Sequence, residues 1–344
     1  MSRTSTAVPF LIATIGGIFS ADRGSAEPLK AGIIGLDSSH CVAFTAILHD
    51  PKAAAPLTDV RVVAAFPGGS ADIPGSKDRV AEYTKVLRDT HKVEIVDSVE
   101  ALIAKVDVVF IESNDGRPHY EDALKVIEAK KPLFIDKPVA GSLADAVAIF
   151  ALAEKRKVPC FSSSALRFTP KIAEAAKSPT FGGVLGCTAY SPCDLEGHHP
   201  DLYWYGIHGV ETLFTVMGPG CKSVVRSSTK DADVVTGTWE DGRVGTFHGI
   251  RAGKKDFGAL VFGSKAIGPT GGFGGYEPLV KEICTFFKTG VSPVKAAETL
   301  EIYAFMSAAD ESKRKKGVPV ALADVLAEAK REATKKTAPP EVRK

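Results

Sequence analysis

The chain has 344 residues, with 43 Lys and Arg against 41 Asp and Glu, and its formal net charge is +2. That length predicts two domains rather than one, and a hydrophobic content of 44% with 24% charged residues is typical of a globular protein. The near balance of charge gives no reason to expect nucleic acid or acidic lipid as a partner.

The N-terminus has the pattern of a secretory signal. Arg3 precedes the apolar run 7–21, and the small residues Gly24, Ser25 and Ala26 follow, which predicts cleavage after Ala26. The run is too short and too rich in glycine for a comfortable membrane span. We therefore expect a protein exported by a Sec-type signal, periplasmic or extracellular, with no membrane span after cleavage. An uncleaved anchor or a loose extension is the alternative.

From residue 29 onward, short apolar strands alternate with helices. Near-continuous apolar runs such as 106–113 and 132–136 are typical of buried parallel strands. Amphipathic segments such as 119–131 and 142–157 predict the helices between them. The β-α-β-α order predicts an α/β domain, a doubly wound, Rossmann-like parallel sheet with helices on both faces.

The pattern changes after about residue 164. Several strand-like segments joined by turns predict an α+β domain with an open, mainly antiparallel sheet, and helices are expected near 206–217, 277–288 and 296–315. The predicted organisation is a signal peptide at 1–26, a Rossmann-like dinucleotide-binding domain at 29–164, an α+β substrate and dimerisation domain at 165–332, and a disordered tail at 333–344.

The first strand and its turn begin like a dinucleotide site. Gly35 stands at the first glycine of G-x-G-x-x-G, but Asp37 and His40 replace the second and third. A carboxylate beside a phosphate, at 4 Å and an effective dielectric of about 20, is repelled by roughly 4 kcal/mol. Asp37 could instead cap the following helix, as could Ser38 or Ser39. A nucleotide then fits only if the Asp37 side chain turns away from it.

The end of the second strand also departs from the usual pattern. NAD sites place an acidic residue there to bind the ribose hydroxyls, whereas residues 66–70 contain none. This absence leaves two alternatives open: a 2′-phosphate with Ser70, Lys77 or Arg79 as contacts, or no ligand at this position.

The segment after the fifth predicted strand carries the strongest motif. It reads Asp136-Lys137-Pro138, and His119 stands eighteen residues before Lys137. These residues resemble the Gfo/Idh/MocA family, of the glucose–fructose oxidoreductase and inositol dehydrogenase type, whose E-K-P motif has Glu where this chain has Asp136.

A second motif lies on a helix of the second domain. Gly206-Ile207-His208 resembles the D-x-G-x-H motif of the same family, with Trp204 in place of its Asp, and Glu211 matches an acidic position that commonly follows. The resemblance covers roughly residues 29–322. The missing carboxylate deprives His208 of one orienting partner. Glu211, on the same helix face, is the candidate substitute.

The resemblance implies an oxidoreductase that uses NAD or NADP on a sugar, cyclitol or related polyol, with the nucleotide at the carboxyl edge of the parallel sheet. It also implies a homo-oligomer formed through the second-domain sheet. The implied catalytic residues are Lys137, His208 and Glu211. The implied substrate contacts are Lys137, Trp204, Tyr205 and His208. The implied nucleotide contacts are Gly35, Leu36, Asp37, Ser38, Ser39, Ser70, Asn114, His119, Asp136 and Lys137. Chemically, an imidazole suits proton transfer near neutral pH, and an ammonium group stabilises a developing alkoxide.

Other patterns leave alternatives open. Tyr203, Trp204 and Tyr205 could form a stacking platform for a sugar ring or ordinary packing at a domain junction. His198-His199-x-Asp201 could be half a metal site, but an exposed loop is favoured, and we expect no metal. The six cysteines lack metal spacing and are interpreted as buried small hydrophobes, although Cys187 and Cys193 could pair. His40 is interpreted as a helix-face residue without a role.

Two rival functions remain. One is a glycoside hydrolase or lyase on the same fold, using His208, Glu211, Asp194 or Glu196, with a transiently used nucleotide or none. The other is a redox-inactive carbohydrate-binding protein. Export sharpens the choice, because free dinucleotide is scarce outside the cytoplasm and an exported dehydrogenase must retain its cofactor tightly.

Overall fold

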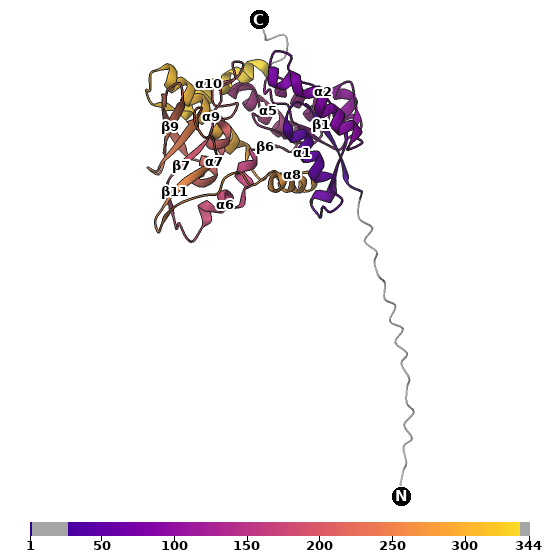
Figure 1. The fold of residues 1–344 in the computed structure, drawn as a ribbon, viewed down its shortest axis with the longest axis horizontal. Coiled ribbons are helices and arrows are strands. Elements are labelled where there is room, and N and C mark those ends of the chain that lie inside the picture. Colours follow the sequence, from indigo (N-terminus) through magenta and orange to yellow (C-terminus); the bar gives the residue numbers. More distant parts are fainter. Residues whose placement is uncertain (2–26, 338–344) are drawn as a thin grey trace.

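The computed structural model describes residue 1 and residues 27–337, which form two domains (Figure 1). The first contains a six-stranded, all-parallel sheet in the order β3-β2-β1-β4-β5-β6. Its strands are β1 (Leu29–Ile34), β2 (Val60–Phe66), β3 (Glu94–Ile95), β4 (Val108–Ile111), β5 (Leu133–Ile135) and β6 (Cys160–Ser162). Its helices are α1 (Ser39–Leu48), η1 (Leu57–Asp59), α2 (Pro74–Asp89), α3 (Val99–Ile103), α4 (His119–Glu128) and α5 (Leu143–Arg156). The predicted Rossmann-like sheet is confirmed.

The centre of this sheet is where a site is expected. All four residues of β4 are buried, as its unbroken apolar run predicts, and β4 pairs with β1 on one side and β5 on the other. The strand order reverses between β1 and β4. Ligands bind in the crevice outside the carboxyl ends of strands at such a reversal, so the turns after β1, β4 and β5 define the first place to look.

The second domain contains a seven-stranded sheet in the order β12-β11-β7-β10-β9-β8-β13. Strands β7 and β10 run parallel, and the other neighbouring pairs are antiparallel. The predicted open, mainly antiparallel sheet is therefore confirmed. The strands are β7 (Val184–Pro192), β8 (Cys221–Ser228), β9 (Ala232–Trp239), β10 (Val244–Ile250), β11 (Gly258–Gly263), β12 (Ile267–Pro269) and β13 (Val320–Ala321). Between β6 and β7 lie the short helices η2 (Ala165–Phe168), α6 (Pro170–Ala173) and η3 (Ala175–Lys177).

Helices cover one face of the second sheet. Helix α7 (Ile207–Met217) packs on β7 and β10, and α9 (Ala296–Arg314) packs on β8. The approach of α7 is close enough to require a glycine, because a Cβ at Gly209 would lie 2.3 Å from the Phe247 ring. This close packing fixes the N-terminal turn of α7, which carries His208.

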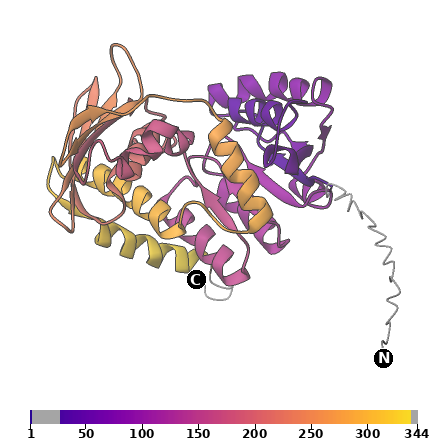
Figure 2. The ribbon, with the colours of Figure 1, turned by 90° about the horizontal axis from the view of Figure 1, so that it is seen from below.

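One helix that the sequence placed in the second domain belongs to the core of the first. Helix α8 (Glu277–Thr289) lies beside the parallel-sheet domain (Figure 2), and its Phe286 ring packs 4.7 Å from that of Phe161 on β6. Leu279 and Ile283 are buried in the same cluster. The strands up to β6 lie in the first sheet and those from β7 onward in the second, but the chain later returns to the first domain through α8.

The C-terminal helix was not predicted from the sequence. Helix α10 (Leu322–Thr337) packs against α5, and Ala333 on it is buried. The prediction of a disordered tail from residue 333 is therefore wrong for 333–337. The remainder, 338–344, and most of the predicted signal peptide, 2–26, lie outside the described residues. Within the described part of the chain, no helix combines the length and the apolar character needed to cross a membrane.

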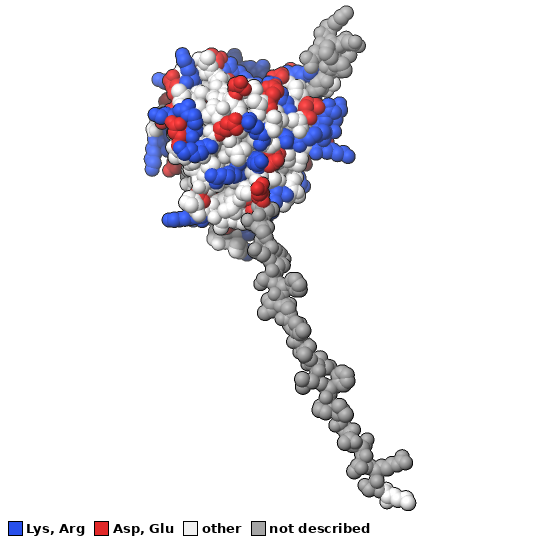
Figure 3. All heavy atoms as spheres, turned by 90° about the vertical axis from the view of Figure 1, so that its right-hand side faces the viewer, with Lys and Arg blue, Asp and Glu red and all other residues white. Residues whose placement is uncertain are grey.

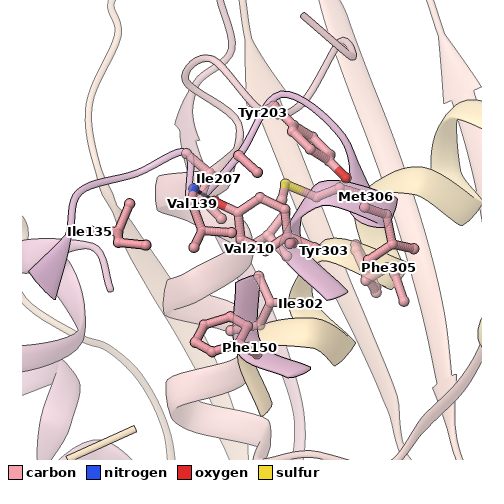
Figure 4. Close-up of a cluster of buried hydrophobic side chains, with 14 of the residues drawn as sticks. Ile135, Val139, Phe150, Tyr203, Ile207, Val210, Ile302, Tyr303, Phe305 and Met306 are labelled. Carbon is pink, nitrogen blue, oxygen red and sulfur yellow. Dashed lines mark hydrogen bonds between the residues drawn. The ribbon is translucent and has the colours of Figure 1, made fainter. Parts of the chain in front are cut away.

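A buried cluster joins the two domains behind the carboxyl edge (Figure 4). Tyr303 of α9 points from the second domain toward the turn after β5, and its hydroxyl accepts a hydrogen bond of 2.6 Å from the N–H of Val139. Ile207 and Val210 of α7 pack into the same cluster. The motif after β5 and the start of α7 are consequently held by one core.

Lys and Arg side chains are interspersed with Asp and Glu over the face shown in Figure 3, as the small net charge leads one to expect.

All six cysteines are free thiols, so Cys187 and Cys193 do not pair. Burial raises the pKa of the Cys187 thiol to about 12, which makes it an inert small hydrophobe.

Candidate active site

A cavity of about 160 Å³ opens at the carboxyl edge of the parallel sheet, where the two domains face each other. The first domain lines it with Lys137 and with the N-terminal turn of α1, and the second domain lines it with His208. The aromatic lining comes from Tyr205, Phe257, Phe273 and Tyr276, and the remaining lining residues are Ser38, Ser39, His40, Arg79, Asn114, Ser164, Ala165 and Leu166. Apolar walls with a few convergent polar groups are typical of a small-molecule site.

Lys137 follows β5 directly and projects into this cavity. Its peptide bond to Pro138 is cis, and the next residue, Val139, is tied to Tyr303 as described above. The Nζ atom lies 5.6 Å from the centroid of the Tyr205 ring, a cation–π distance. The lysine is thus anchored from behind by the buried core and in front by an aromatic face.

His208 is the second residue of α7 and reaches the cavity from the opposite side. Its Nδ1 lies 2.8 Å from Ser164 Oγ, a hydroxyl that can accept from Nδ1–H or donate to it and so suits both tautomers. Burial, then the charges of Lys137 and His40, lower the pKa of His208 well below its ordinary value. The imidazole is neutral at physiological pH, with Nε2 left to meet a ligand. The structure therefore brings Lys137 and His208 to one cavity, as the sequence predicted.

Glu211 is not at the cavity. Its Oε1 accepts hydrogen bonds from Ser163 Oγ at 2.8 Å and from Arg167 Nε at 2.5 Å, and Arg167 also pairs with Glu298 at 2.7 Å. The side chain is buried in this network. The expectation that Glu211 is catalytic or replaces the missing Asp as the partner of His208 is not met, because Ser164 takes that place. Glu211 fixes the segment that carries Ser164 and is a positioning residue.

The three consecutive aromatic residues before α7 have different environments. Tyr205 lines the cavity, and its ring lies 5.8 Å from that of His208. Trp204, expected to bind substrate, packs instead against His199 at 5.1 Å between ring centroids. Tyr203 is fully buried, with its hydroxyl 2.9 Å from Ser307 Oγ. Only Tyr205 of the three serves as a platform, because the other two fill the domain junction.

Three further aromatic walls were missed by the sequence analysis. The rings of Phe257, Phe273 and Tyr276 follow one another around the cavity, 6.5 Å apart for the first pair and 5.0 Å for the second. Phe273 and Tyr276 lie in the glycine-rich run 271–276 just before α8. Large aromatic residues in a segment otherwise made of glycine could have indicated a binding role. Their place beside the cavity could not be foreseen, because the sequence does not show that α8 returns to the first domain.

The turn between β1 and α1 keeps its first glycine for a clear reason. Gly35 has a φ of +91°, and a Cβ there would lie 2.5 Å from the backbone nitrogen of Ser113. The Leu36 N–H, which was expected to contact the nucleotide, donates to the Pro67 carbonyl at 2.7 Å. This N–H is therefore occupied by the loop that follows β2.

Asp37 turns away from the cavity. Its carboxylate accepts from the backbone N–H of Asn114 at 3.0 Å and from Ser76 Oγ at 2.5 Å, and it is fully buried. The helix cap is Ser38, whose hydroxyl accepts from the N–H of His40 at 3.1 Å. The proposed capping role of Asp37 is thus replaced by a different one, in which it holds together the turns after β1 and β4.

The fit of a dinucleotide differs between the two ends of the crevice. Ser38 and Ser39 at the N-terminus of α1, together with Arg79 of α2, line the cavity, which suits an anionic phosphate. At the adenosine end, the loops after β2 and β4 touch: Ser70 Oγ donates to Asp115 at 2.5 Å. Arg117 then bridges Asp115 at 2.7 Å and Asp72 at 2.8 Å.

The phosphate and nicotinamide end therefore fits the cofactor, and the adenosine end is closed by these contacts. Ligand pockets commonly span about 300–1,000 Å³, so the cavity of about 160 Å³ is too small for a whole dinucleotide. Ser70, expected to bind the nucleotide, serves here as part of the closure. A dinucleotide requires the loops after β2 and β4 to separate.

His119 was expected to contact the cofactor and is instead fully buried. Its Nδ1 lies 2.9 Å from the Pro138 carbonyl and its Nε2 lies 3.1 Å from the Ser113 carbonyl. The ring joins the turn after β4 to the turn that holds Lys137. Asn114 does line the cavity, and its Nδ2 donates to the Asp37 carbonyl at 2.6 Å.

The expected exposed loop is confirmed for His198, which is exposed in the turn before α7, but is wrong for His199. His199 is buried, with Nδ1 2.6 Å from Glu196 and Nε2 3.2 Å from Asp115 of the first domain. His198 is 2.7 Å from Glu196 and 3.4 Å from Asp72. The pair therefore links the two domains. Of the acids named for the rival mechanism, Glu196 is engaged here and Asp194 pairs with Lys255 at the surface.

Asp136, expected to contact the nucleotide, lies behind Lys137 in a buried cluster. His40 Nδ1 is 2.6 Å from Asp136 Oδ2 and 4.0 Å from Glu112 Oε2. These three side chains come from α1 and from the ends of β5 and β4. The interpretation of His40 as a helix-face residue without a role is not supported, since it brings a ring nitrogen to two carboxylates.

Comparison with known proteins agrees with this architecture. Residues 30–164 match the sequence model of the Gfo/Idh/MocA family, described as an oxidoreductase family with an NAD-binding Rossmann fold. This match is to the same family that the sequence analysis recognised, and it confirms the recognition over residues 30–164. A search of curated proteins found no significant match.

Solved structures share the fold over both domains. A probable dehydrogenase from Thermotoga maritima has 20% identity and a TM-score of 0.70, with 86% of this chain and 100% of that chain covered. The scyllo-inositol dehydrogenase of Lactobacillus casei, with bound NAD(H) and scyllo-inositol, has 14% identity and a TM-score of 0.70 over 86% and 99% of the two chains. GenD2 from gentamicin A biosynthesis, in complex with NAD, has 15% identity and a TM-score of 0.69 over 86% and 97%.

Proposed function

We propose that this protein is an NAD(P)-dependent oxidoreductase that acts on a small polyol, such as a sugar or cyclitol, in the cavity between Lys137 and His208. The observation that carries the proposal is that an ammonium group from the first domain and a neutral imidazole from the second line one cavity. The aromatic walls suit the apolar faces of a sugar ring, and the polar groups suit its hydroxyls.

The chain's own residues divide the work between them. Lys137 donates a hydrogen bond to the reacting oxygen and stabilises negative charge that develops on it. His208 exchanges the hydroxyl proton at Nε2, while Ser164 holds Nδ1. When bound, the nicotinamide cofactor would accept or donate the hydride. Ser38, Ser39 and Arg79 would hold its phosphates, and Asn114 lines the same side of the cavity.

Lys137→Met tests this role most directly. We expect a loss of turnover of about 1,000-fold with the fold unchanged, because the variant removes charge stabilisation made in the transition state. The assay is the appearance of NAD(P)H with a panel of sugars and cyclitols. Lys281→Met, an exposed lysine paired with Glu277 on α8, is the matched control. Wild-type turnover in Lys137→Met would remove Lys137 from the mechanism.

Cofactor binding is tested separately from turnover. The protein is purified from the compartment in which it accumulates, denatured, and its supernatant analysed for NAD(H) and NADP(H). The purified protein is also heated with each nucleotide added. Released nucleotide or a rise in Tm supports the proposal, and the absence of both would contradict it.

The closed adenosine crevice favours a second candidate, a lyase or hydrolase that acts on glycosides at the same cavity without net redox change. The Ser70–Asp115 contact and the small cavity support it. A glycoside panel distinguishes the candidates, since a lyase consumes substrate without accumulating NAD(P)H. Binding of sugars without any turnover would instead indicate a redox-inactive carbohydrate-binding protein.

We further propose that the protein is exported and assembles as a homo-oligomer. Export predicts a mature chain that starts at Glu27, measured as the intact mass of protein from the periplasm or medium.

Assembly is supported by apolar side chains on the open face of the second sheet: Val244, Leu260, Phe262 and Ile267 are 37–65% exposed. Phe262→Glu should yield monomers in light scattering after gel filtration, and an unchanged mass would place the interface elsewhere.

A further inference from the structure

Three acid–base side chains meet behind the cavity at the carboxyl edge of the parallel sheet. His40 comes from α1, Glu112 follows β4 and Asp136 follows β5, so each is carried by an element adjoining the central crevice. One ring nitrogen and one carboxylate oxygen from each acid all lie within 4.8 Å of one another. All three side chains are buried, with 7%, 0% and 2% of their residue surface exposed for His40, Glu112 and Asp136.

The polar atoms of this cluster are left without partners. Neither carboxylate oxygen of Glu112 has a hydrogen-bond partner among the described residues, and neither does Oδ1 of Asp136. His40 Nδ1 is 2.6 Å from Asp136 Oδ2, yet the pair lacks hydrogen-bond geometry. Buried carboxyl groups are almost always hydrogen-bonded, paired or bound to a metal. A ring nitrogen and carboxylate oxygens that lie close together without forming hydrogen bonds have the arrangement expected of ligands to one shared ion.

We propose that His40, Glu112 and Asp136 bind a divalent transition-metal ion, such as Zn²⁺ or Mn²⁺. One imidazole and two carboxylates form a donor set that suits these ions. Three protein ligands leave a position open for water or a ligand, as in catalytic metal sites. Since His40 also lines the cavity that contains Lys137 and His208, an ion bound here would lie beside the proposed substrate site and could polarise a hydroxyl or carbonyl oxygen there.

The site also accounts for a departure in the sequence. His40 stands where G-x-G-x-x-G has its third glycine, a position normally kept small for close packing of helix and strand. Here the imidazole occupies that position and stacks on Phe44 with ring centroids 5.2 Å apart. The metal site stands independently of the proposed redox reaction, since it is argued from buried groups alone.

The test is metal binding by the full chain. Protein freed of metal with a chelator is dialysed against Zn²⁺ or Mn²⁺, and bound ion is measured by elemental mass spectrometry. We expect one equivalent for wild type and a loss of affinity of at least about 100-fold for Glu112→Gln and for Asp136→Asn. Glu196→Gln, which alters the neighbouring histidine–carboxylate group, is the matched control and should keep wild-type affinity. Co²⁺ should give visible absorption bands in wild type that Glu112→Gln lacks.

A measurement on the wild-type protein covers the case in which these variants do not fold. Zn²⁺ should shift the ring ¹⁵N resonances of His40 and leave those of His199 in place. No bound ion, or equal binding by wild type and Glu112→Gln, would overturn the proposal. Lys137→Met removes a positive charge beside Asp136 and should still bind one equivalent of metal, so loss of turnover in that variant and loss of metal in Glu112→Gln report on separate claims.

Discussion

The carboxyl edge of the parallel sheet has two histidine–carboxylate clusters of similar composition and opposite completeness. In the first, His199 lies within 3.2 Å of both Glu196 and Asp115, and Asp115 is further paired with Arg117 and Ser70. In the second, His40 meets Glu112 and Asp136, and three carboxylate oxygens have no hydrogen-bond partner among the described residues.

The difference separates structural from functional uses of the same residue types. A cluster whose polar atoms are all paired stabilises the contact between the domains and needs no ligand. A cluster that buries unpaired oxygens stores a cost, which a bound ion would remove. Burial alone would rank the two clusters together, whereas counting hydrogen-bond partners distinguishes them.

The largest expected effect comes from truncating one acid in each cluster. Asp115→Ala leaves Arg117 and His199 without their shared partner and should lower the free energy of unfolding by about 3 kcal/mol. Glu112→Met, in metal-free protein, replaces an unpaired acid by an apolar side chain of similar length and should leave that free energy unchanged or raise it by about 1 kcal/mol.

Urea unfolding in the presence of a chelator measures both variants, with wild type under identical conditions as the control. If Glu112→Met were as destabilising as Asp115→Ala, the two clusters would be equivalent, and Glu112 would have a partner in solution.

A smaller effect is expected on the pKa of His208, which is coupled to the incomplete cluster. Lys137 and His40 lower this pKa and Asp136 raises it. Lys137→Met should therefore raise the pKa of His208, and Asp136→Asn should lower it. Glu196→Gln, in the complete cluster, should not change it. The measurement is an NMR titration of the imidazole. If the pKa of His208 were the same in Lys137→Met and wild type, the two groups would not share the cavity.

The fold could be predicted because local patterns determine it. Unbroken apolar runs such as 106–113 indicated parallel strands, and the change of pattern near residue 164 located the second sheet. The placement of α8 could not be predicted, since an amphipathic pattern indicates that one face of the helix is buried but not which domain's core buries it. Helix α10 was missed for the same reason, because its contacts with α5 are tertiary.

The candidate site was predicted in part for a comparable reason. Lys137 and His208 belong to short sequence motifs, and such motifs can be recognised without knowing the tertiary structure. The roles of Glu211, Asp37 and Trp204 depend on which group lies opposite, and spacing carries no information about that. His40 was set aside because a single histidine on a helix has no meaning until Asp136 and Glu112 are placed beside it.

The smallest expected effect is the contribution of the cluster of His199, Glu196 and Asp115 to the pH dependence of the free energy of unfolding. Burial by itself would lower the pKa of His199, but hydrogen bonds and charges from Asp115 and Glu196 outweigh it and raise the pKa above the ordinary 6.5. A raised pKa in the folded state means that the stabilisation is fully present below pH 6.5 and is lost as the pH rises through the folded-state pKa. The contribution is on the order of 1 kcal/mol.

His199→Gln should therefore show a flatter loss of Tm than wild type as the pH rises above neutrality. His208 and His119 have lowered pKa values and act in the opposite direction, losing stability as the pH falls, but both remain in the variant and cancel in the difference from wild type. His248→Gln, at an exposed position on β10, controls for the substitution itself. Parallel curves for His199→Gln and wild type would mean that the imidazole is neutral throughout, and the complete cluster would then be held by hydrogen bonds without a contribution from charge.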